Sequence, residues 1–299
     1  MYYTGCIQNL YNYYSWNRVY QGGAIMKFKF SKKLLTVGAV ALMVVGGLAG
    51  CGAKNNTAYN KIKSEKTLTM GTSADFAPFE FPVVKNGKKT YNGFDIMVAN
   101  QIAKDMGVKL KVQNMQFSSL IGELQNNKVQ MVMAGMTATK QRRKAVDFSK
   151  PYYTESEALL VKNSDANKYT TKDSTKGASF GAQQGSIQEN VGKSQTKAHI
   201  VSEGLVTSLT TELKGGKLDG VVLAQKVAEE YVKKYPNDYA IAPVKLPVPK
   251  SQREICIALP KNELKLKKKV NAEITKMQKN GQLDKMFQQA QQLQEQSGK

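Results

Sequence analysis

Strand and helix patterns alternate along this chain in two successive runs, and this alternation limits the possible folds more than any other feature. Residues 67–72 have the pattern of a strand, residues 95–106 place apolar side chains at helical spacing, and residues 129–134 form another short apolar run. A second run with the same alternation of strands and helices covers residues 158–242. Because alternating strands and helices build parallel sheets, we predict an α/β protein with two lobes, each a mostly parallel sheet flanked by helices.

A strand pattern and two helix patterns remain after the second run. They lie at residues 254–259, 263–279 and 283–292. Elements left over at the end of two α/β units indicate that the chain crosses back and completes the first lobe. We therefore predict lobe 1 from residues 67–155 plus 250–299, lobe 2 from residues 156–249, and a hinge formed by the two connecting segments.

The N-terminal region has the pattern of an export signal. Lysines within residues 27–33 precede an apolar run from Leu34 to Ala49, which is short for a helix that must cross a bilayer with about 20 residues. A permanent transmembrane helix is therefore the weaker interpretation. The sequence LAGC that ends at Cys51 resembles the bacterial lipobox, which implies a diacylglycerol on the Cys51 thiol; the alternative is an ordinary signal peptide with an incidental cysteine.

These patterns divide the N-terminal region into three parts. Residues 1–25 are rich in Tyr and Asn and show no periodicity, whereas a complete signal peptide begins at Met26. We predict that translation starts at Met26 and that residues 1–25 are an upstream extension assigned to the protein by mistake. The signal peptide then covers residues 26–50, and the lipidated cysteine and a flexible polar tether cover residues 51–66.

The composition argues against several classes of function. The three cysteines are too few and too scattered for a disulfide framework, and the single histidine, His199, cannot supply the sets of histidines found in most zinc hydrolases. We expect no metal, and the absence of a P-loop or a dinucleotide fingerprint predicts no cofactor. The formal charge is +21, but the lysines are interleaved with acids, which favours an anionic membrane or cell wall over nucleic acid.

Two neighbouring segments carry a specific resemblance. Residues 135–142 read GMTATKQR and residues 146–153 read VDFSKPYY, and both resemble the signature of amino-acid-binding proteins of ABC importers. Flanking segments match in the same order at residues 71–81, 93–95 and 117–120. The resemblance extends over residues 68–288 and is to bacterial extracellular solute-binding proteins of family 3. It implies a type II periplasmic-binding-protein-like fold with a ligand cleft between the lobes.

A free amino acid offers a carboxylate, an ammonium group and a side chain as three features to recognise. Arg142 suits the carboxylate because a guanidinium group forms a planar fork, and the resemblance implies this role at this position. Gly135, Met136 and Thr137 would add backbone groups and a hydroxyl. Alternatively, Arg142 is a solvated residue in a helical turn capped by Thr139.

Further candidate ligand residues come from both lobes. Phe76 and Phe117 match aromatic positions that sandwich the aliphatic part of the ligand in the family, although either could belong to an ordinary core. A helix start in lobe 2 offers free N–H groups to an anion, with a plain helix cap as the alternative. Its candidate residues are Gln184, Gly185, Ser186, Ile187 and Gln188.

One position departs from the family pattern. The strand within residues 218–225 matches a strand whose end usually carries an acid for the ligand's ammonium group, but this chain has Ala224 there. Either Asp75 or Glu80 supplies the negative charge, or the amine of the ligand is modified, absent or bound through water. These two acids could instead recognise the side chain of arginine, lysine or ornithine, or they could be loop capping groups.

We therefore expect a monomeric binding protein rather than an enzyme. It would capture a polar or basic amino acid by lobe closure and deliver it to an ABC permease and its ATPase. Its expected location is the extracytoplasmic face of the cell membrane, lipid-anchored on a Gram-positive cell surface. The alternatives are an enzyme on the same fold, similar to cyclohexadienyl dehydratases, and a surface adhesin or sensor module.

Overall fold

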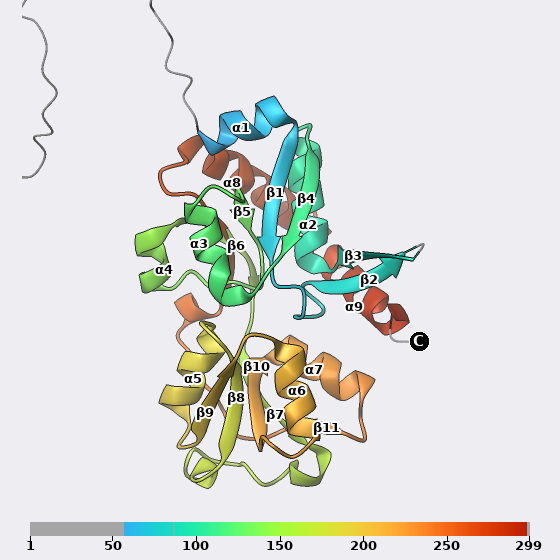
Figure 1. The fold of residues 1–299 in the computed structure, drawn as a ribbon, viewed down its shortest axis with the longest axis vertical. Coiled ribbons are helices and arrows are strands. Elements are labelled where there is room, and N and C mark those ends of the chain that lie inside the picture. Colours follow the sequence, from blue (N-terminus) through green and yellow to red (C-terminus); the bar gives the residue numbers. More distant parts are fainter. Residues whose placement is uncertain (1–56, 86, 298–299) are drawn as a thin grey trace, which may run out of the picture. The chain divides into compact units, whose positions relative to one another are not determined.

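The computed structural model describes residues 57–85 and 87–297 and builds them around two five-stranded sheets (Figure 1). The predicted upstream extension, the signal peptide and lipidated Cys51 lie outside the described residues. Within the described part of the chain, no helix combines the length and apolar character needed to cross a membrane.

The first sheet has the strand order β4-β1-β5-β12-β6. Its strands are β1 (Thr67–Thr72), β4 (Lys109–Asn114), β5 (Met131–Val132), β6 (Asp147–Thr154) and β12 (Glu254–Leu259). The elements associated with it are the hairpin of β2 (Phe81–Lys85) and β3 (Lys88–Asn92) and the helices α1 (Ala58–Glu65), α2 (Phe94–Asp105), α3 (Leu120–Gln125), α4 (Lys140–Ala145), α8 (Leu264–Lys279) and α9 (Gln282–Ser297). Together they form lobe 1. Every residue of β12 from Ile255 to Leu259 is buried, as in a central strand that is covered on both faces.

The second sheet has the strand order β11-β7-β10-β8-β9 and defines lobe 2. Its strands are β7 (Glu157–Lys162), β8 (Ser179–Gln183), β9 (His199–Glu203), β10 (Gly220–Ala224) and β11 (Tyr239–Ile241), and its helices are α5 (Ile187–Gln195), α6 (Val206–Lys214) and α7 (Gln225–Lys234). Short 3₁₀ helices lie at Phe117–Ser119, Asn163–Asp165, Asp173–Thr175 and Lys250–Gln252. All five residues of β10 are buried, so this strand forms the centre of the lobe.

The prediction of mostly parallel sheets is wrong for half of the strand pairs. In lobe 1, β1 pairs in parallel with β4 and β5, whereas β12 runs antiparallel to both β5 and β6. In lobe 2, β8 pairs in parallel with β9 and β10, whereas β7 runs antiparallel to β10 and β11. The chain leaves lobe 1 through β6, enters lobe 2 directly as β7, and later returns to lobe 1 as β12. A parallel pair would need a crossover connection, usually a helix, between its strands within one lobe.

The prediction of a flexible tether is wrong for the residues that form α1, because this helix packs on β1 and α8 (Figure 1). Thr57 caps this helix, because its side chain accepts a hydrogen bond from the Asn60 N–H. Ile62 is completely buried, and the Ala58 N–H donates to Glu263 Oε1 of lobe 1 at 2.6 Å. Only Ala58 and Ile62 of the helix are buried, so its sequence has the polar composition of a linker.

An aromatic cluster holds the loop after β1 to the rest of lobe 1. Phe79 packs edge to face with Phe94 at 6.1 Å between ring centroids, and Phe94 does the same with Phe287 at 5.3 Å. Tyr153 stacks on Phe287 at 4.7 Å. Because these side chains come from α2, α9, β6 and the loop, the cluster fixes the loop that carries Asp75, Phe76 and Glu80.

Candidate functional site

Arg142 forms the centre of the candidate site. Its Nη1 donates hydrogen bonds to the Thr137 carbonyl oxygen at 2.7 Å and to Thr137 Oγ1 at 3.3 Å, and its Nη2 donates to the Gly185 carbonyl oxygen at 2.9 Å. The guanidinium carbon lies 5.1 Å from the centroid of the Phe117 ring, which is within cation–π distance. Burial lowers the pKa of Arg142 to about 10, so the side chain stays cationic at neutral pH. Three predicted ligand residues from the two lobes, Thr137, Phe117 and Gly185, therefore meet at the guanidinium group of a fourth, Arg142.

The start of α4 positions Arg142. The Thr139 side chain accepts a hydrogen bond from the Arg142 N–H, so the predicted cap is present. The helix has only six residues, and none of them is fully buried. Arg142 is thus held by its own hydrogen bonds rather than by packing of the helix.

Gly135 and Phe76 lie in direct contact. Gly135 has a positive φ of 55°, and a Cβ atom there would lie 2.8 Å from the Phe76 ring. The Gly135 N–H donates to Asp95 Oδ2 at 3.0 Å, and Tyr152 Oη donates to Asp95 Oδ1 at 2.6 Å. Asp95 is completely buried and therefore acts as a positioning residue beneath this glycine. Its role was not predicted, although it ends the matching segment at residues 93–95.

Glu80 is a poor counter-charge for a ligand. Its side chain is completely buried beside Asp95. Burial and then the charge of Asp95 raise the pKa of Glu80 well above its ordinary value. The shift favours the neutral form of the carboxyl group, and its complete burial in lobe 1 keeps it away from a ligand.

Asp75 has the contacts of a helix cap. Its Oδ2 accepts a hydrogen bond from the Val206 N–H at 2.6 Å, and its Oδ1 accepts one from Ser73 Oγ at 3.1 Å. Val206 begins α6 in lobe 2, and the preceding Leu205 provides no side-chain cap. A carboxylate of lobe 1 therefore satisfies the N-terminus of a helix in lobe 2. Of the readings open for Asp75, capping is the one that its contacts match, although the cap is on a helix rather than a loop.

The segment at the start of α5 is a helix cap that keeps two donors available. Ser186 Oγ accepts a hydrogen bond from the Glu189 N–H, and Glu189 Oε2 accepts one from the Gly185 N–H at 2.7 Å. Gly185 has a φ of 74°. The N–H groups of Ile187 and Gln188 have no acceptor within the described residues. The alternatives of a cap and an anion site are therefore compatible here, because these two N–H groups are free for an anion.

Three other candidate residues lie around these groups. Gln184 is exposed, and its N–H donates to the Glu203 carbonyl oxygen at 2.8 Å. Met136 is completely buried in the core of lobe 1, and its carbonyl oxygen accepts a hydrogen bond from the Cys256 N–H. Ala224 is buried at the end of β10. These positions support the site through backbone or packing rather than through a charged group.

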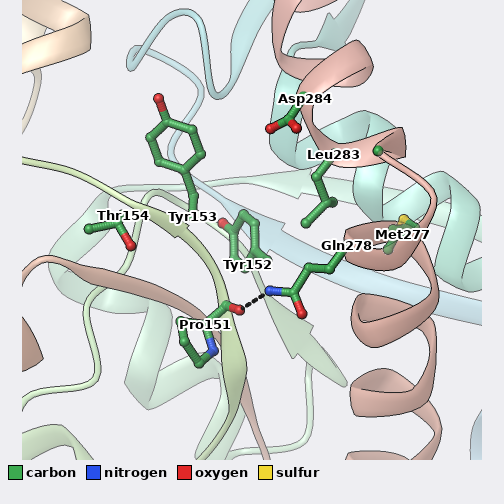
Figure 2. A pocket seen from close by; sticks show the side chains of 9 residues that line it. Pro151, Tyr152, Tyr153, Thr154, Met277, Gln278, Leu283 and Asp284 are labelled. Atoms are coloured by element: carbon green, nitrogen blue, oxygen red, sulfur yellow. Dashed lines mark hydrogen bonds between the residues drawn. The ribbon is translucent and has the colours of Figure 1, made fainter.

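A pocket of about 360 Å³ lies elsewhere in lobe 1, between β6 and the helices α8 and α9 (Figure 2). Its walls include Tyr152, Met277 and Asp284, and Gln278 Nε2 donates to the Pro151 carbonyl oxygen at 3.0 Å across it. None of the predicted ligand residues lines this pocket. The pocket is therefore not part of the candidate site around Arg142.

The buried acids predict how stability changes with pH. Burial raises the pKa of Asp95 to about 6, of Glu155 to about 7 and of Glu157 to about 8. The folded state therefore binds protons more tightly than the unfolded chain, and the stability from these groups is lost as the pH rises through their folded pKa values. We expect the free energy of unfolding to fall between about pH 5 and pH 8, by up to about 1.4 kcal/mol per pH unit for each titrating carboxyl.

Urea denaturation of the ligand-free protein across this range measures the effect. The variant Glu157→Gln is expected to flatten the slope between about pH 7 and pH 8, because the pKa of Glu157, about 8, lies above those of Asp95 and Glu155. A free energy of unfolding that rises steadily with pH would contradict the expectation.

Residues 68–291 match the family model for bacterial extracellular solute-binding proteins, family 3. This chain belongs to that family. The match covers both lobes, including Arg142, the start of α5 and the end of β10. Within the described residues of this solute-binding protein, no group of three or more His, Cys, Asp or Glu side chains could hold a metal ion.

Relatives with known names and structures share the family fold. The chain is 34% identical to the arginine-binding extracellular protein ArtP of Bacillus subtilis, over 83% of this chain and 93% of ArtP. It is also 34% identical to the substrate-binding protein AbpA of an amino acid ABC transporter from Streptococcus pneumoniae, whose crystal structure contains L-arginine; the TM-score is 0.75, over 79% of this chain and 98% of AbpA.

A third relative bears on enzymatic activity. It is AncCDT-1, an ancestral amino acid-binding protein of known crystal structure that is a precursor of cyclohexadienyl dehydratase. The identity is 30% and the TM-score 0.70, over 78% of this chain and 99% of AncCDT-1. The predicted two-lobed α/β fold of the periplasmic-binding-protein type is thus confirmed.

Proposed function

We propose that this chain is the amino-acid-binding component of an ABC importer. The observation that carries the proposal is the Arg142 guanidinium, which is held by Thr137 and Phe117 in lobe 1 and donates to Gly185 at the start of α5 in lobe 2. A carboxylate that replaces the Gly185 carbonyl as the acceptor would receive a charged donor from one lobe. It would receive backbone N–H groups from the other lobe.

Binding by closure follows from where these groups lie. Arg142 and the aromatic residues belong to lobe 1, whereas the α5 amides belong to lobe 2, so a ligand contacts all of them only when the lobes come together. A ligand that binds the closed state more tightly shifts the protein towards it. The closed form is the one that we propose is delivered to the permease and its ATPase.

Arginine is the ligand that we favour within the class of polar and basic amino acids. The relatives ArtP and AbpA are named for arginine or contain it. The Phe76 ring lies against Gly135, close to the predicted carboxylate site, and an aromatic face suits both the aliphatic part and the guanidinium group of arginine.

Export and lipid anchoring complete the proposal. The basic residues before Leu34, the apolar run up to Ala49 and the small residues before Cys51 support a lipoprotein signal peptide. The lipid on Cys51 would hold the binding protein at the extracytoplasmic face of the membrane, near its permease.

A non-catalytic role fits these observations better than an enzyme on the same fold. ArtP and AbpA are binding proteins, and AncCDT-1 is itself an amino acid-binding protein that precedes an enzyme. Asp75 and Glu80 are the acids that such an enzyme could use, but Asp75 caps α6 and Glu80 is completely buried in lobe 1.

Thermal unfolding in the presence of each proteinogenic L-amino acid tests the proposed function. A ligand that binds only the folded state raises the midpoint by mass action, so we expect the largest rise with L-arginine and smaller rises with other polar amino acids. No rise with any of these amino acids, at concentrations up to several millimolar, would contradict amino acid binding.

A further inference from the structure

Glu157 lies at the edge of lobe 2 where the candidate ligand groups converge. It is the first residue of β7 and pairs directly with Ala224, the last residue of β10. Residues directly opposite in an antiparallel pair place their side chains on the same face, with Cβ atoms about 5 Å apart. The parallel strands β8 and β10 both end at this edge, and α5 begins beside it (Figure 1). In open α/β sheets, ligands bind at this carboxyl edge.

The carboxyl group of Glu157 is buried without a cation of the protein beside it. The residue is 8% exposed, and Oε2 accepts one hydrogen bond, from Gln188 Nε2 at 2.9 Å. Within the described residues no lysine, arginine or histidine forms an ion pair with it, and Oε1 accepts no hydrogen bond. Burying a carboxylate without a partner is unfavourable and raises the pKa of Glu157 to about 8, and an external cation beside it would favour its charged form.

Three other acids are less suited to bind a cation of the ligand. Asp75 accepts hydrogen bonds from Val206 and Ser73, and Glu80 is buried in the core beside Asp95. Glu155 accepts hydrogen bonds from the backbone N–H groups of Ser156 at 2.7 Å and Lys226 at 3.4 Å. Compared with these three acids, Glu157 is the one that lies at this edge of lobe 2, is buried and keeps an acceptor atom without a hydrogen bond.

Glu157 also lies close to the proposed carboxylate site. Gln188, its hydrogen-bond partner, is three residues after Gly185, whose carbonyl oxygen accepts from Arg142. The Gln188 N–H is one of the two free donors at the start of α5. The α-carboxylate and α-ammonium groups of an amino acid are attached to the same carbon, so their binding groups must lie close together in this way.

We propose that Glu157 binds the α-ammonium group of the amino acid ligand, from the strand beside Ala224. This inference rests on the proposed function and assigns the negative charge to a residue that was not among the sequence candidates. It also predicts which atoms meet: the α-ammonium donates to Oε1 of Glu157, and Gln188 keeps Oε2 in place. The side chain of the ligand is left to the aromatic residues of lobe 1.

Isothermal titration calorimetry with two matched ligands tests this assignment. L-arginine is compared with 5-guanidinopentanoate, which lacks only the α-amine; L-glutamine and 4-carbamoylbutanoate are the corresponding pair if glutamine binds more tightly. We expect the native protein to prefer the amino acid by about 100-fold or more, and Glu157→Gln to reduce this preference to below about 10-fold. Binding of the deaminated ligand should change little, which also shows that the variant is folded.

Two further variants make the test specific. The double variant Glu157→Gln with Ala224→Asp moves the carboxylate to the opposite strand and is expected to restore most of the preference. Glu155→Gln removes a buried acid two residues away and should leave the preference intact. An unchanged preference in Glu157→Gln, or an equal loss in Glu155→Gln, would overturn the assignment. Failure of the native protein to bind any amino acid would instead refute the proposed function.

Discussion

Arg142→Ala is expected to weaken amino acid binding by about 100- to 1,000-fold, because truncating one partner of a buried charge pair costs about 2–5 kcal/mol. Among the residues that the structure describes, this guanidinium is the charged donor of lobe 1 that also contacts lobe 2, through Gly185. Its loss would leave the ligand carboxylate with backbone donors alone. Isothermal titration calorimetry with L-arginine measures the change, and thermal unfolding without ligand shows whether the variant is folded.

Two variants serve as controls for Arg142→Ala. Arg142→Lys keeps the positive charge but not the planar fork, so we expect an intermediate loss of about 10-fold. Arg143→Ala removes the neighbouring guanidinium, which donates to Ala138 at 3.0 Å and packs over Phe148, away from Gly185. It should leave the affinity unchanged. Native affinity in Arg142→Ala would exclude this residue from the binding site.

Gly93→Ala is expected to destabilise the protein by at least about 3 kcal/mol, which combines backbone strain with a steric overlap. Gly93 has a φ of 127°, and a Cβ atom there would lie 2.3 Å from the Phe79 carbonyl oxygen. That close approach allows the Phe94 and Asp95 N–H groups to donate to the Pro78 and Phe79 carbonyl oxygens. The alanine variant would therefore disrupt both the start of α2 and the loop that carries Phe76.

Urea denaturation of Gly93→Ala and of Gly107→Ala separates the two causes. Gly107 also has a positive φ, of 66°, but nothing lies within 4 Å of the position that its Cβ would take. Substitution there should cost only about 1 kcal/mol, from backbone strain alone. If the two variants lose equal stability, the close contact between Gly93 and Phe79 does not contribute.

Much of the fold could be predicted because its elements have strong local signals. The predicted strand over residues 254–259 coincides with β12, and the predicted helix over residues 95–106 matches α2 to within one residue at each end. The helix repeats its apolar positions at helical spacing, and the strand is a short continuous apolar run. The hairpin of β2 and β3 was not predicted, because its residues after Phe81 are mostly exposed and polar and leave no alternating pattern.

Some residues of the candidate site could be predicted from the sequence and others could not. Thr137, Arg142 and Gly185 were predicted from contiguous motifs, and the structure brings them together at one guanidinium group. Asp95 and Glu157 were not predicted to act in the site. Asp95 depends on a hydrogen bond to Gly135, 40 residues away, and Glu157 depends on its pairing with Ala224. Contacts of this kind leave no periodic trace in the sequence.

The α/β class, the two lobes and Arg142 as the candidate residue for a carboxylate could be predicted from the sequence, because periodicity and motifs are local properties of the chain. The mixed direction of the strands, the helical state of α1 and the partners of the buried acids became visible only in the three-dimensional structure. These depend on which distant segments exclude water from one another. Asp75, Glu80 and Glu157 have similar side chains, yet Asp75 caps a helix, Glu80 is completely buried in a core and Glu157 keeps an acceptor atom without a hydrogen bond.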